Sequence, residues 1–587
     1  MIQSETQEGT GKIVIVDKDR PWAEALQTIL RGRGYAIDIE TNDLQNCYEK
    51  AREGEYVAAV VNVHSLSNYK KELTEFNHSF PVVLVLLIME HEDPEAETLH
   101  WQPNAVAHQF LGKKEDRLYA QFAEAIDNLI RFYGIIPDFN IILPENIDSI
   151  FSSYAQSRTG VTRMKPELSL KAMKQELLVV ISRLFSNRSD QNNQPIVKEI
   201  KVDAFGEDAG KSGSLMFKIT PKIVLDDKMR KSAVLKFGPK EETHRESLNY
   251  DKFVEWFLTY DQTVRKIKYA EGNKFGGILY SYPRDVVGGY ESFADYMRGE
   301  DESKCTSMIG KMFNVDNQHW LSVDGNSFVD RETAIFQTYY IDHVLHASLH
   351  EMRSTHLKKL ADEINNLERR LGRKLEKRIW EYRDDSITFP YLDISIPNPV
   401  SFLNDPSLVE GIKLTVIHGD LHAHNIIVTA TEKDERYFFI DFYYTGFGDI
   451  YRDFIELELS VRYDLFCSSS LPAQKRLTAP DCNSTAADGL KKLIRLENAL
   501  INGTVYGKES MDPLLNENKD IHKAFRIISE IRRFAFENCA DKKKVYYMGL
   551  IVSALKALKY FYPLDVKIHR LVVAGLYLRL LKEGKIS

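Results

Sequence analysis

The sequence predicts a multidomain protein in which an α/β domain precedes a larger α+β region. Three observations support this prediction. Residues 12 to 133 alternate unbroken apolar runs with amphipathic helices, a pattern typical of a parallel sheet covered on both faces. From Val197 onward, short alternating strands follow one another at hairpin spacing, and helical periodicity dominates the C-terminal part. The chain has 587 residues, well beyond the ~150 of a common single domain.

Composition narrows the class of protein further. Hydrophobic residues make up 43% and charged residues 28%, which excludes a disordered chain. The 77 Lys and Arg against 85 Asp and Glu give a net charge of −8, which argues against nucleic-acid or membrane binding. The 5 cysteines have no CxxC spacing, and the longest apolar run, Val82 to Met89, is too short to cross a bilayer. With no signal-peptide pattern at the start, we expect a cytoplasmic protein that uses no disulfide framework.

After a tail at residues 1–10, residues 11–133 contain repeated strand and helix signals. The expected strands are Lys12–Val16, Ala36–Ile39, Tyr56–Val63, Pro81–Met89 and Val106–Leu111. This succession resembles the flavodoxin-like receiver domain of two-component response regulators. The resemblance implies a phosphoryl-accepting site where the strands end.

The receiver chemistry is incomplete at those positions. The first strand ends in Asp17-Lys18-Asp19, with a lysine where one of two adjacent acids is usual. Asn62 stands at the phospho-acceptor position, and Leu86 stands where Ser or Thr is expected; Lys113 alone matches. An amide is a far poorer phosphoryl acceptor than a carboxylate. We therefore expect a degenerate receiver that serves docking, with a homodimer or a signalling partner, rather than an aspartyl-phosphate switch.

Residues 134–195 differ in composition from the domain before them. Prolines interrupt the opening, and residues 186–195 form a polar run without apolar periodicity. Between them, Leu168 to Phe185 has the spacing of an amphipathic helix. We expect a helical connector that packs on the receiver, on the next domain or on a second chain.

A glycine-rich loop opens the next region, for which we expect an N-lobe at residues 196–287. The loop, Gly206–Ser214, lies between the expected strands Glu199–Phe205 and Leu215–Ile219. A Walker A loop needs four residues between its glycines and opens a helix, whereas here there are three and a strand follows. A kinase-type glycine loop fits better, and a plain hairpin is the alternative. The candidate phosphate contacts are Gly210, Ser212 and Gly213.

The next strand carries a lysine at the position where kinase-type folds contact nucleotide phosphates. This strand is Ser232–Phe237, with Lys236 near its end. The helix that follows contains Glu246, which can pair with Lys236 and hold it in place. Glu242 and Glu255 are the other candidates for that pairing. We expect Lys236 and Glu246 to belong to the nucleotide site.

The most specific motif follows the expected strand Leu414–Ile417. His418-Gly419-Asp420 comes directly after this strand, Asn425 lies five residues beyond Asp420, and Asp441-Phe442 ends the next hairpin. The pattern resembles the aminoglycoside phosphotransferase and choline-kinase branch of the protein-kinase-like fold, whose signature is H-G-D-x-x-x-x-N followed by I-D-[FW]. The resemblance covers residues 196–587 and implies an α+β bilobal domain, with the C-lobe at residues 288–587.

The resemblance also implies roles for individual residues. Asp420 accepts or orients the proton of the attacking hydroxyl, and His418 completes the catalytic group by bracing the loop. Asn425 and Asp441 supply oxygen ligands to Mg²⁺, which bridges the phosphates of ATP. Asp453, in the downstream G-x-G-D-x-x-x-D continuation, anchors the catalytic loop.

The remaining segments of the C-lobe have helical spacing. We expect helices over Glu332–Met352 and Leu357–Ile379, forming a helical insertion before the catalytic loop. The tail from Lys491 to Leu581 ends in amphipathic helices that close the lobe.

Together these features predict an ATP- and Mg²⁺-dependent phosphotransferase fused to a degenerate receiver, acting in signalling. The expected acceptor is a hydroxyl group of a small molecule or of a protein. The alternative hypothesis is a non-catalytic pseudokinase and pseudo-receiver scaffold that docks partners.

Overall fold

Two compact units make up the chain. The computed structural model describes residues 12–32, 35–40, 44–48, 51, 56–62, 65–66, 71–73, 75–76, 84–89, 109–112, 139–158, 170–185, 197–204, 214–223, 232–258, 263–272, 274–281, 291–313, 333–371, 378–430, 435–466, 485–506, 519–538, 543–560, 562 and 564–586. The first unit holds Met1–Leu248 and Arg265–Pro283, and the second holds Asn249–Val264 and Arg284–Ser587. The segment 249–264, which we expected in the N-lobe, thus groups with the second unit.

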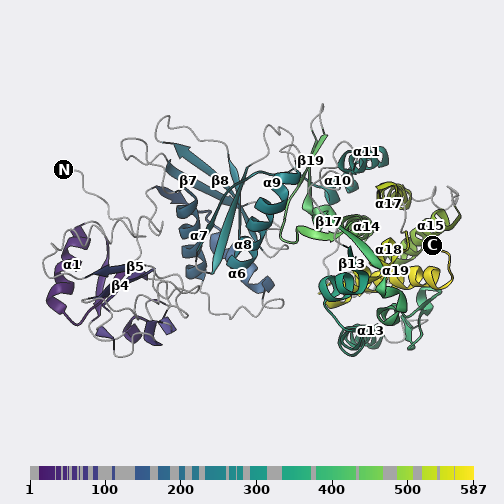
Figure 1. Cartoon of the computed structure of the whole chain (residues 1–587), viewed down its shortest axis with the longest axis horizontal. Coiled ribbons are helices and arrows are strands. Elements are labelled where there is room, and N and C mark those ends of the chain that lie inside the picture. The colour runs from purple at the N-terminus through teal and green to yellow at the C-terminus, as the bar shows by residue number, and fades with distance from the viewer. Residues whose placement is uncertain are drawn as a thin grey trace. The chain divides into compact units, whose positions relative to one another are not determined.

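The N-terminal domain is a parallel sheet with the receiver strand order. The order is β2-β1-β3-β4-β5, and every pair is parallel (Figure 1). The elements are β1 (Lys12–Val16), α1 (Arg20–Gly32), β2 (Ile37–Glu40), η1 (Leu44–Cys47), β3 (Tyr56–Asn62), β4 (Leu84–Met89) and β5 (Gln109–Gly112). The apolar side chains of β1 are fully buried, as a central strand covered on both faces requires. The predicted flavodoxin-like receiver fold is confirmed.

A second, mostly antiparallel sheet follows in the first unit, in the order β10-β11-β9-β8-β7-β6. Its strands are β6 (Asn140–Ile142), β7 (Val197–Ala204), β8 (Leu215–Ile223), β9 (Ala233–Pro239), β10 (Lys266–Glu271) and β11 (Phe275–Ser281). The helices of this region are α6 (Ile147–Arg158), α7 (Leu170–Phe185) and α8 (Lys240–Asn249). This sheet and α8 are the N-lobe elements of the predicted kinase-like fold.

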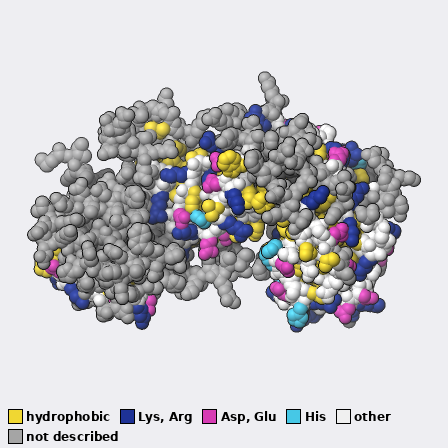
Figure 2. All heavy atoms as spheres, viewed as in Figure 1, with side chains coloured by type: hydrophobic (Ala, Val, Ile, Leu, Met, Phe, Trp, Pro, Cys, Tyr) yellow, Lys and Arg dark blue, Asp and Glu magenta, His cyan; other side chains and the backbone are white. Residues whose placement is uncertain are grey.

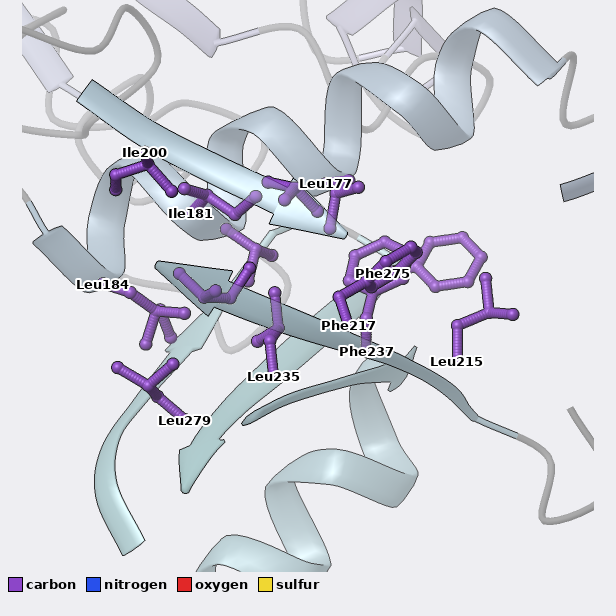
Figure 3. Close-up of a cluster of buried hydrophobic side chains, with 14 of the residues drawn as sticks. Leu177, Ile181, Leu184, Ile200, Leu215, Phe217, Leu235, Phe237, Phe275 and Leu279 are labelled. Atoms are coloured by element: carbon purple, nitrogen blue, oxygen red, sulfur yellow. The ribbon is translucent and has the colours of Figure 1, made fainter. Parts of the chain in front are cut away.

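The expected connector at residues 134–195 contributes to this sheet and its core. β6 pairs in parallel with β7, and α7 packs on β10 and β11. Figure 3 shows Leu177 and Ile181 of α7 directed at the buried side chains of the strands. The periodicity of Leu168 to Phe185 identified the helix but not the face of the sheet that it covers. Of the three alternatives, the described part of this segment packs on the next domain, where α7 contributes to the core of the sheet.

The second unit combines small sheets with a bundle of helices. The sheet orders are β13-β17-β20, β12-β18-β19 and β14-β15-β16. Their strands are β12 (Glu291–Ser292), β13 (Thr333–Ile335), β14 (Glu381–Tyr382), β15 (Ser386–Phe389), β16 (Ile394–Pro397), β17 (Gly411–Ile417), β18 (Ile426–Ala430), β19 (Glu435–Phe439) and β20 (Gly446–Asp449). These elements complete the predicted kinase-like fold class.

The helices of the second unit extend to the end of the chain. They are η3 (Tyr250–Val254), α9 (Glu255–Phe257), α10 (Phe293–Gly299), α11 (Glu302–Phe313), η5 (Gln337–Leu345), α12 (Leu349–Glu351), η6 (Met352–Leu357), α13 (Lys358–Leu371), η8 (Pro390–Leu392), η9 (Pro399–Asn404), η10 (Pro406–Val409), η11 (Ala423–Asn425), α14 (Arg452–Phe466), α15 (Thr485–Tyr506), α17 (Lys519–Asn538), α18 (Lys543–Lys556), η12 (Ala557–Lys559) and α19 (Leu564–Lys582). In contact with α14 lie α15, α17 and α18.

The expected helix over Glu332–Met352 is wrong at its start and is interrupted at His346. Residues 333–335 form β13, which pairs with β17, and the π-helix η5 follows. His346 then adopts a left-handed conformation with φ of 49°, which ends η5. The apolar spacing of this segment suits a helix, but pairing with β17 takes its first residues into a sheet.

A buried ionic network joins α14 to three other helices. Arg462 of α14 is fully buried and lies 2.5 Å from Glu497 of α15 and 2.7 Å from Glu458. Arg532 of α17 donates to both oxygens of Glu458, at 2.8 and 3.0 Å, and the hydroxyl of Tyr546 on α18 also bonds Glu458. Burial acts to raise the pKa of Glu458, but the two arginines outweigh it and lower that pKa to about 2.

The surface of the described part of the chain mixes both signs of charge. On the face in Figure 2, dark blue Lys and Arg side chains are interspersed with magenta Asp and Glu side chains. Among the described residues, every helix is too short or too polar to cross a membrane.

We expect Arg532→Met to lower the free energy of unfolding by roughly 3–5 kcal/mol, because it leaves a buried carboxylate short of one partner. Arg533 provides a matched control on the same helix, since its ion pairs with Glu530 and Glu537 are solvent-exposed. Arg533→Met should cost at most about 1 kcal/mol. Chemical denaturation of the three proteins measures both values, and equal losses would show that the network adds nothing specific.

Candidate functional site

The nucleotide-site lysine predicted on β9 forms a buried ion pair. Lys236 Nζ lies 2.6 Å from Glu246 Oε2, and both side chains are almost fully buried. The hydroxyl of Tyr280 on β11 donates to the other oxygen of Glu246, at 2.7 Å. Of the three carboxylates considered from the sequence, Glu246 is the one in this ion pair. Tyr280 was missed, because nothing in its strand marks it as a partner of a helix 34 residues earlier.

Strand alternation explains how Lys236 reaches α8. Leu235 and Phe237 point into the core that they share with Leu177 of α7 (Figure 3), so the side chain between them faces the opposite side of the sheet. That side is covered by α8, which packs closely on β11. A Cβ on Gly276 would lie 2.2 Å from the hydroxyl oxygen of Thr243, so this approach requires a glycine. The close packing brings Glu246 down to the lysine.

The glycine loop lies outside the described residues. Gly210, Ser212 and Gly213 therefore remain predictions from the sequence, and so does the choice between a kinase-type loop and a plain hairpin.

The second unit holds the motif around Asp420, and a carboxylate fixes the backbone of this loop. After β17, the N–H groups of His418 and Gly419 donate to the two oxygens of Asp453, at 2.7 and 2.8 Å. Asp453 is buried in the first turn of α14. Each carboxylate oxygen thus accepts one backbone hydrogen bond, an arrangement that holds the loop at a fixed angle to the helix. This geometry fits the anchoring role implied for Asp453.

Gly419 is required in this loop by its conformation and by its surroundings. Its φ is +82°, in the region that favours glycine, and an added Cβ would lie 2.4 Å from the carbonyl oxygen of Tyr444. The chain turns sharply here, so that Asp420 leaves the strand while the backbone stays bound to Asp453. Any side chain at position 419 would push the loop away from the segment before β20.

His418 lies behind the loop. It is 1% exposed, and its Nε2 is 2.9 Å from the carbonyl oxygen of Ile440. Burial lowers the pKa of this imidazole, so it is neutral at pH 7 and donates to that carbonyl. The hydrogen bond ties the loop to the residue preceding Asp441. His418 therefore lies buried behind the loop, where its imidazole is bonded to backbone.

Backbone and amide hydrogen bonds bring Asp420, Asn425 and Asp441 into one region. The side-chain nitrogen of Asn425 donates to the carbonyl oxygen of Asp420 at 2.9 Å, and the N–H of Ile440 donates to the carbonyl oxygen of Asn425 at 3.0 Å. This second bond continues the β18–β19 ladder by one step, so Asn425 and Asp441 lie at the same end of the hairpin. The side chain of Asp420 is 30% exposed and remains accessible.

These donors fit a magnesium ion in kind. Because the nitrogen of Asn425 is used by Asp420, its amide oxygen is turned away from that carbonyl, and Asp441 adds a carboxylate. An amide oxygen and a carboxylate, completed by water and phosphate oxygens, are what Mg²⁺ usually takes in nucleotide sites. No cluster of three or more His, Cys, Asp or Glu with metal-binding geometry occurs in the described part of the chain. A protein-only metal cage is thus absent there.

Asp441 has an unusual backbone. Its φ is +67°, one of three positive values at described non-glycine residues. Aspartate tolerates this region better than most residues, and such strain concentrates at functional positions. The conformation turns the chain out of the β19 direction immediately after the bond to Asn425. Sequence patterns do not show this feature.

A buried acid near the loop was missed as a titrating group. Asp449, at the end of β20, is fully buried, and the hydroxyl of Tyr340 in η5 donates to it at 2.5 Å. Burial raises the pKa of Asp449 to about 7, although hydrogen bonds act against that rise. Its place in the G-x-G-D pattern was visible in the sequence, but its hydrogen bond with η5, 109 residues earlier, was not.

In the receiver-like domain, the carboxylate of Asp17 is in contact with neighbouring polar side chains of the same domain. Asp17 is buried, and its Oδ1 accepts a hydrogen bond from the amide of Asn62 at 3.1 Å. The hydroxyl of Ser65 is 3.5 Å from the same oxygen and accepts from the N–H of Lys18. An amide and a hydroxyl thus compensate a carboxylate that in a working receiver would face a cation. Lys113 and the side chain of Leu86 lie outside the described residues.

Comparison with known proteins finds several similarities. Residues 341–559 match the family model described as ternary complex associated domain 9. An orphan response regulator of H. pylori is 15% identical over 20% of this chain and 95% of that one, with a TM-score of 0.18. An amicoumacin kinase, solved with AMP-PNP and Ca²⁺, is 9% identical over 71% and 96% of the two chains, with a TM-score of 0.32. A microcompartment-associated aminopropanol kinase is 12% identical over 66% of this chain and 94% of that one, with a TM-score of 0.30. No curated protein matches the chain.

The raised pKa of Asp449 predicts a pH dependence of stability. In the unfolded chain this carboxyl ionises near its ordinary pKa of 3.8, whereas in the folded chain it keeps its proton up to about pH 7. The contribution of Asp449 to the free energy of unfolding therefore falls as the pH rises from about 4 to about 7, and it is constant above that pH. Asp449→Asn removes the titration while keeping the shape of the protonated acid. Relative to wild type, this variant should gain unfolding free energy from pH 4 to pH 7, measured by denaturation at each pH; a constant difference would contradict the assignment.

Proposed function

We propose that the chain is an ATP- and Mg²⁺-dependent phosphotransferase that acts on a hydroxyl acceptor in a signalling context. The observation that carries the proposal is the loop from His418 to Asn425. Its backbone is held by the carboxylate of Asp453, its buried histidine is tied to the segment before Asp441, and Asp420 remains accessible at its turn. Phosphoryl transfer demands chiefly such positioning and neutralisation of charge.

Each residue has a task in this proposal. Asp420 accepts a hydrogen bond from the acceptor hydroxyl and takes its proton as the oxygen attacks the γ-phosphorus. Lys236, kept in place by Glu246, bonds phosphate oxygens of the nucleotide. Asn425 and Asp441 would hold Mg²⁺, whose positive charge would offset the negative charge of the phosphate oxygens. His418 and Asp453 keep the loop in the geometry that the attack requires.

The receiver-like domain has a different task in this proposal. Asn62 cannot take a phosphoryl group as an aspartate does, and it already bonds Asp17. We infer that the domain docks a partner or a second copy of the chain and does not switch by phosphorylation. The alternative is a scaffold without catalysis. It shares this docking role and differs only in predicting that the second unit does not transfer phosphoryl groups.

Replacement of Asp420 tests the proposed activity. Asp420→Asn should reduce phosphoryl transfer from ATP by roughly 100-fold or more, because a general base commonly contributes 10²–10⁴-fold. Its affinity for Mg²⁺–AMP-PNP should stay within about twofold of wild type. Release of ADP in the presence of a panel of alcohols measures the first, and calorimetry measures the second.

A matched control lies in the same unit. Asp384 is exposed and holds nothing in the loop through its side chain, so Asp384→Asn should transfer at the wild-type rate. A wild-type protein that binds Mg²⁺–AMP-PNP yet releases no ADP with any alcohol or with water would favour the scaffold. Full activity in Asp420→Asn would refute the assigned base.

A further inference from the structure

A group of side chains with unused hydrogen-bond donors lies beside Asp420 in the second unit. Its members are Lys556, at the end of α18, Tyr560 and Tyr562, in the segment after η12, and Arg570, on α19; together they are called the donor cluster. Among the residues that the structure describes, none forms a hydrogen bond with the ammonium, the two phenol hydroxyls or the guanidinium. The known steps of phosphoryl transfer from ATP assign these groups no task.

The neighbouring carboxylate does not neutralise the donor cluster. Glu456 of α14 lies 2.5 Å from Arg452 Nη2, and Arg452 is further held by the hydroxyl of Ser553, at 2.8 Å. Glu456 is therefore already paired with a buried arginine. Lys556 Nζ is 3.9 Å from the same Glu456 oxygen, beyond hydrogen-bond distance, although its side chain is only 23% exposed. The ammonium has been removed from most of its water without receiving a hydrogen-bond partner in return.

Contacts along α14 place the donor cluster close to Asp420: Asp453 accepts from the N–H of the adjacent Gly419 at 2.8 Å, and Glu456, three residues later on the same helix, lies 3.9 Å from Lys556 Nζ. Burial first, and then the negative charge of Asp420, raise the pKa of the Tyr560 phenol. Asp420 also acts to raise the pKa values of Tyr562 and Lys556, while burial dominates and lowers that of Lys556. His422, whose Nε2 lies 3.8 Å from Asp420 Oδ2, has the opposite effect on Glu456 and acts to lower the pKa of that carboxyl.

The charges that act directly on the donor cluster leave an excess of positive charge there. Arg452, Lys556 and Arg570 are three cations, and Asp420 and Glu456 are two carboxylates. The rings of Tyr560 and Tyr562 lie 6.2 Å apart and are 45% and 40% exposed, so each offers an apolar face next to its hydroxyl. Cations and hydroxyl donors beside aromatic faces suit a small organic anion. A polycationic acceptor would instead meet like charges.

We propose that the donor cluster binds an anionic group of the acceptor, so that the substrate is a small alcohol carrying a phosphate or a carboxylate. This inference rests on the proposed function and specifies its acceptor. The hydroxyl oxygen of the bound alcohol forms a bond to the γ-phosphorus of ATP as the bond from that phosphorus to the β–γ bridging oxygen breaks. ADP leaves, and the hydroxyl proton passes to Asp420 and then to solvent.

Four compounds with one carbon skeleton test the charge preference. Glycerol 3-phosphate, glycerate, glycerol and 3-amino-1,2-propanediol carry a phosphate, a carboxylate, no charge and an ammonium. Each is titrated into the full chain saturated with Mg²⁺–AMP-PNP, and each is then offered with ATP while ADP release is followed. One or both anions should bind at least about tenfold more tightly than the amine, because charge-assisted hydrogen bonds are the strong ones. The two anionic compounds distinguish phosphate from carboxylate recognition.

Variants on α18 connect that preference to the donor cluster. Lys556→Gln should weaken binding of the preferred anion by about tenfold or more and leave the amine unchanged, whereas Lys556→Arg should retain most of the affinity. Lys544→Gln is the matched control, because it removes the same charge from the other end of the helix, where Lys544 pairs with Glu410 at 3.0 Å. Tyr560→Phe provides a second variant that keeps the fold and removes one hydroxyl donor.

Several results would overturn the inference. These are preference for the amine, no binding of either anion at millimolar concentration, or equal effects of Lys556→Gln and Lys544→Gln. A loss of Mg²⁺–AMP-PNP affinity in Lys556→Gln as large as the loss for the anion would also overturn it, since the lysine would then serve the nucleotide. Failure of the proposed function is a separate result: the wild type would bind no nucleotide, or Asp420→Asn would transfer normally, whatever the anions do.

Discussion

The candidate site depends on the two hydrogen bonds by which Asp453 holds the backbone of His418 and Gly419. They fix the direction in which the chain leaves β17, and that direction determines where Asp420 lies. The loop has no regular structure of its own to impose this geometry. A carboxylate in the first turn of a long buried helix supplies it. The position of the loop is therefore set by the position of α14.

Helix α14 is in turn held by contacts along its whole length. The hydroxyl of Ser460 accepts a hydrogen bond of 2.9 Å from the N–H of Ala423, three residues after Asp420. Further along, Glu458 and Arg462 form the buried network with α15, α17 and α18. Near its start, Arg452 and Glu456 face the donor cluster. One helix thus anchors the loop, connects it to the helical bundle, and carries the charges beside the proposed base.

Much of this architecture could be predicted from the sequence where local pattern and structure agree. The unbroken apolar strands of the receiver-like domain, the lysine on β9 and the H-G-D loop are local signals that tertiary contacts leave unchanged. Other features depend on contacts between distant residues. The strands β13 to β16 are two to four residues long, and β13 arises from pairing with β17 rather than from its own periodicity. Likewise, the partners of Arg462 and Arg532 lie 35 and 74 residues away, a distance over which spacing carries no information.

Calorimetric titration with Mg²⁺–AMP-PNP tests the central claim most directly, namely that the chain holds a working nucleotide site. The wild type and Asp441→Ala should be compared, each with Mg²⁺ and with the metal removed by a chelator. The account predicts binding that needs the metal and that weakens about tenfold or more in Asp441→Ala, because the variant loses a charged ligand of the metal. Absence of binding in the wild type, or binding that is indifferent to both the metal and Asp441, would contradict it.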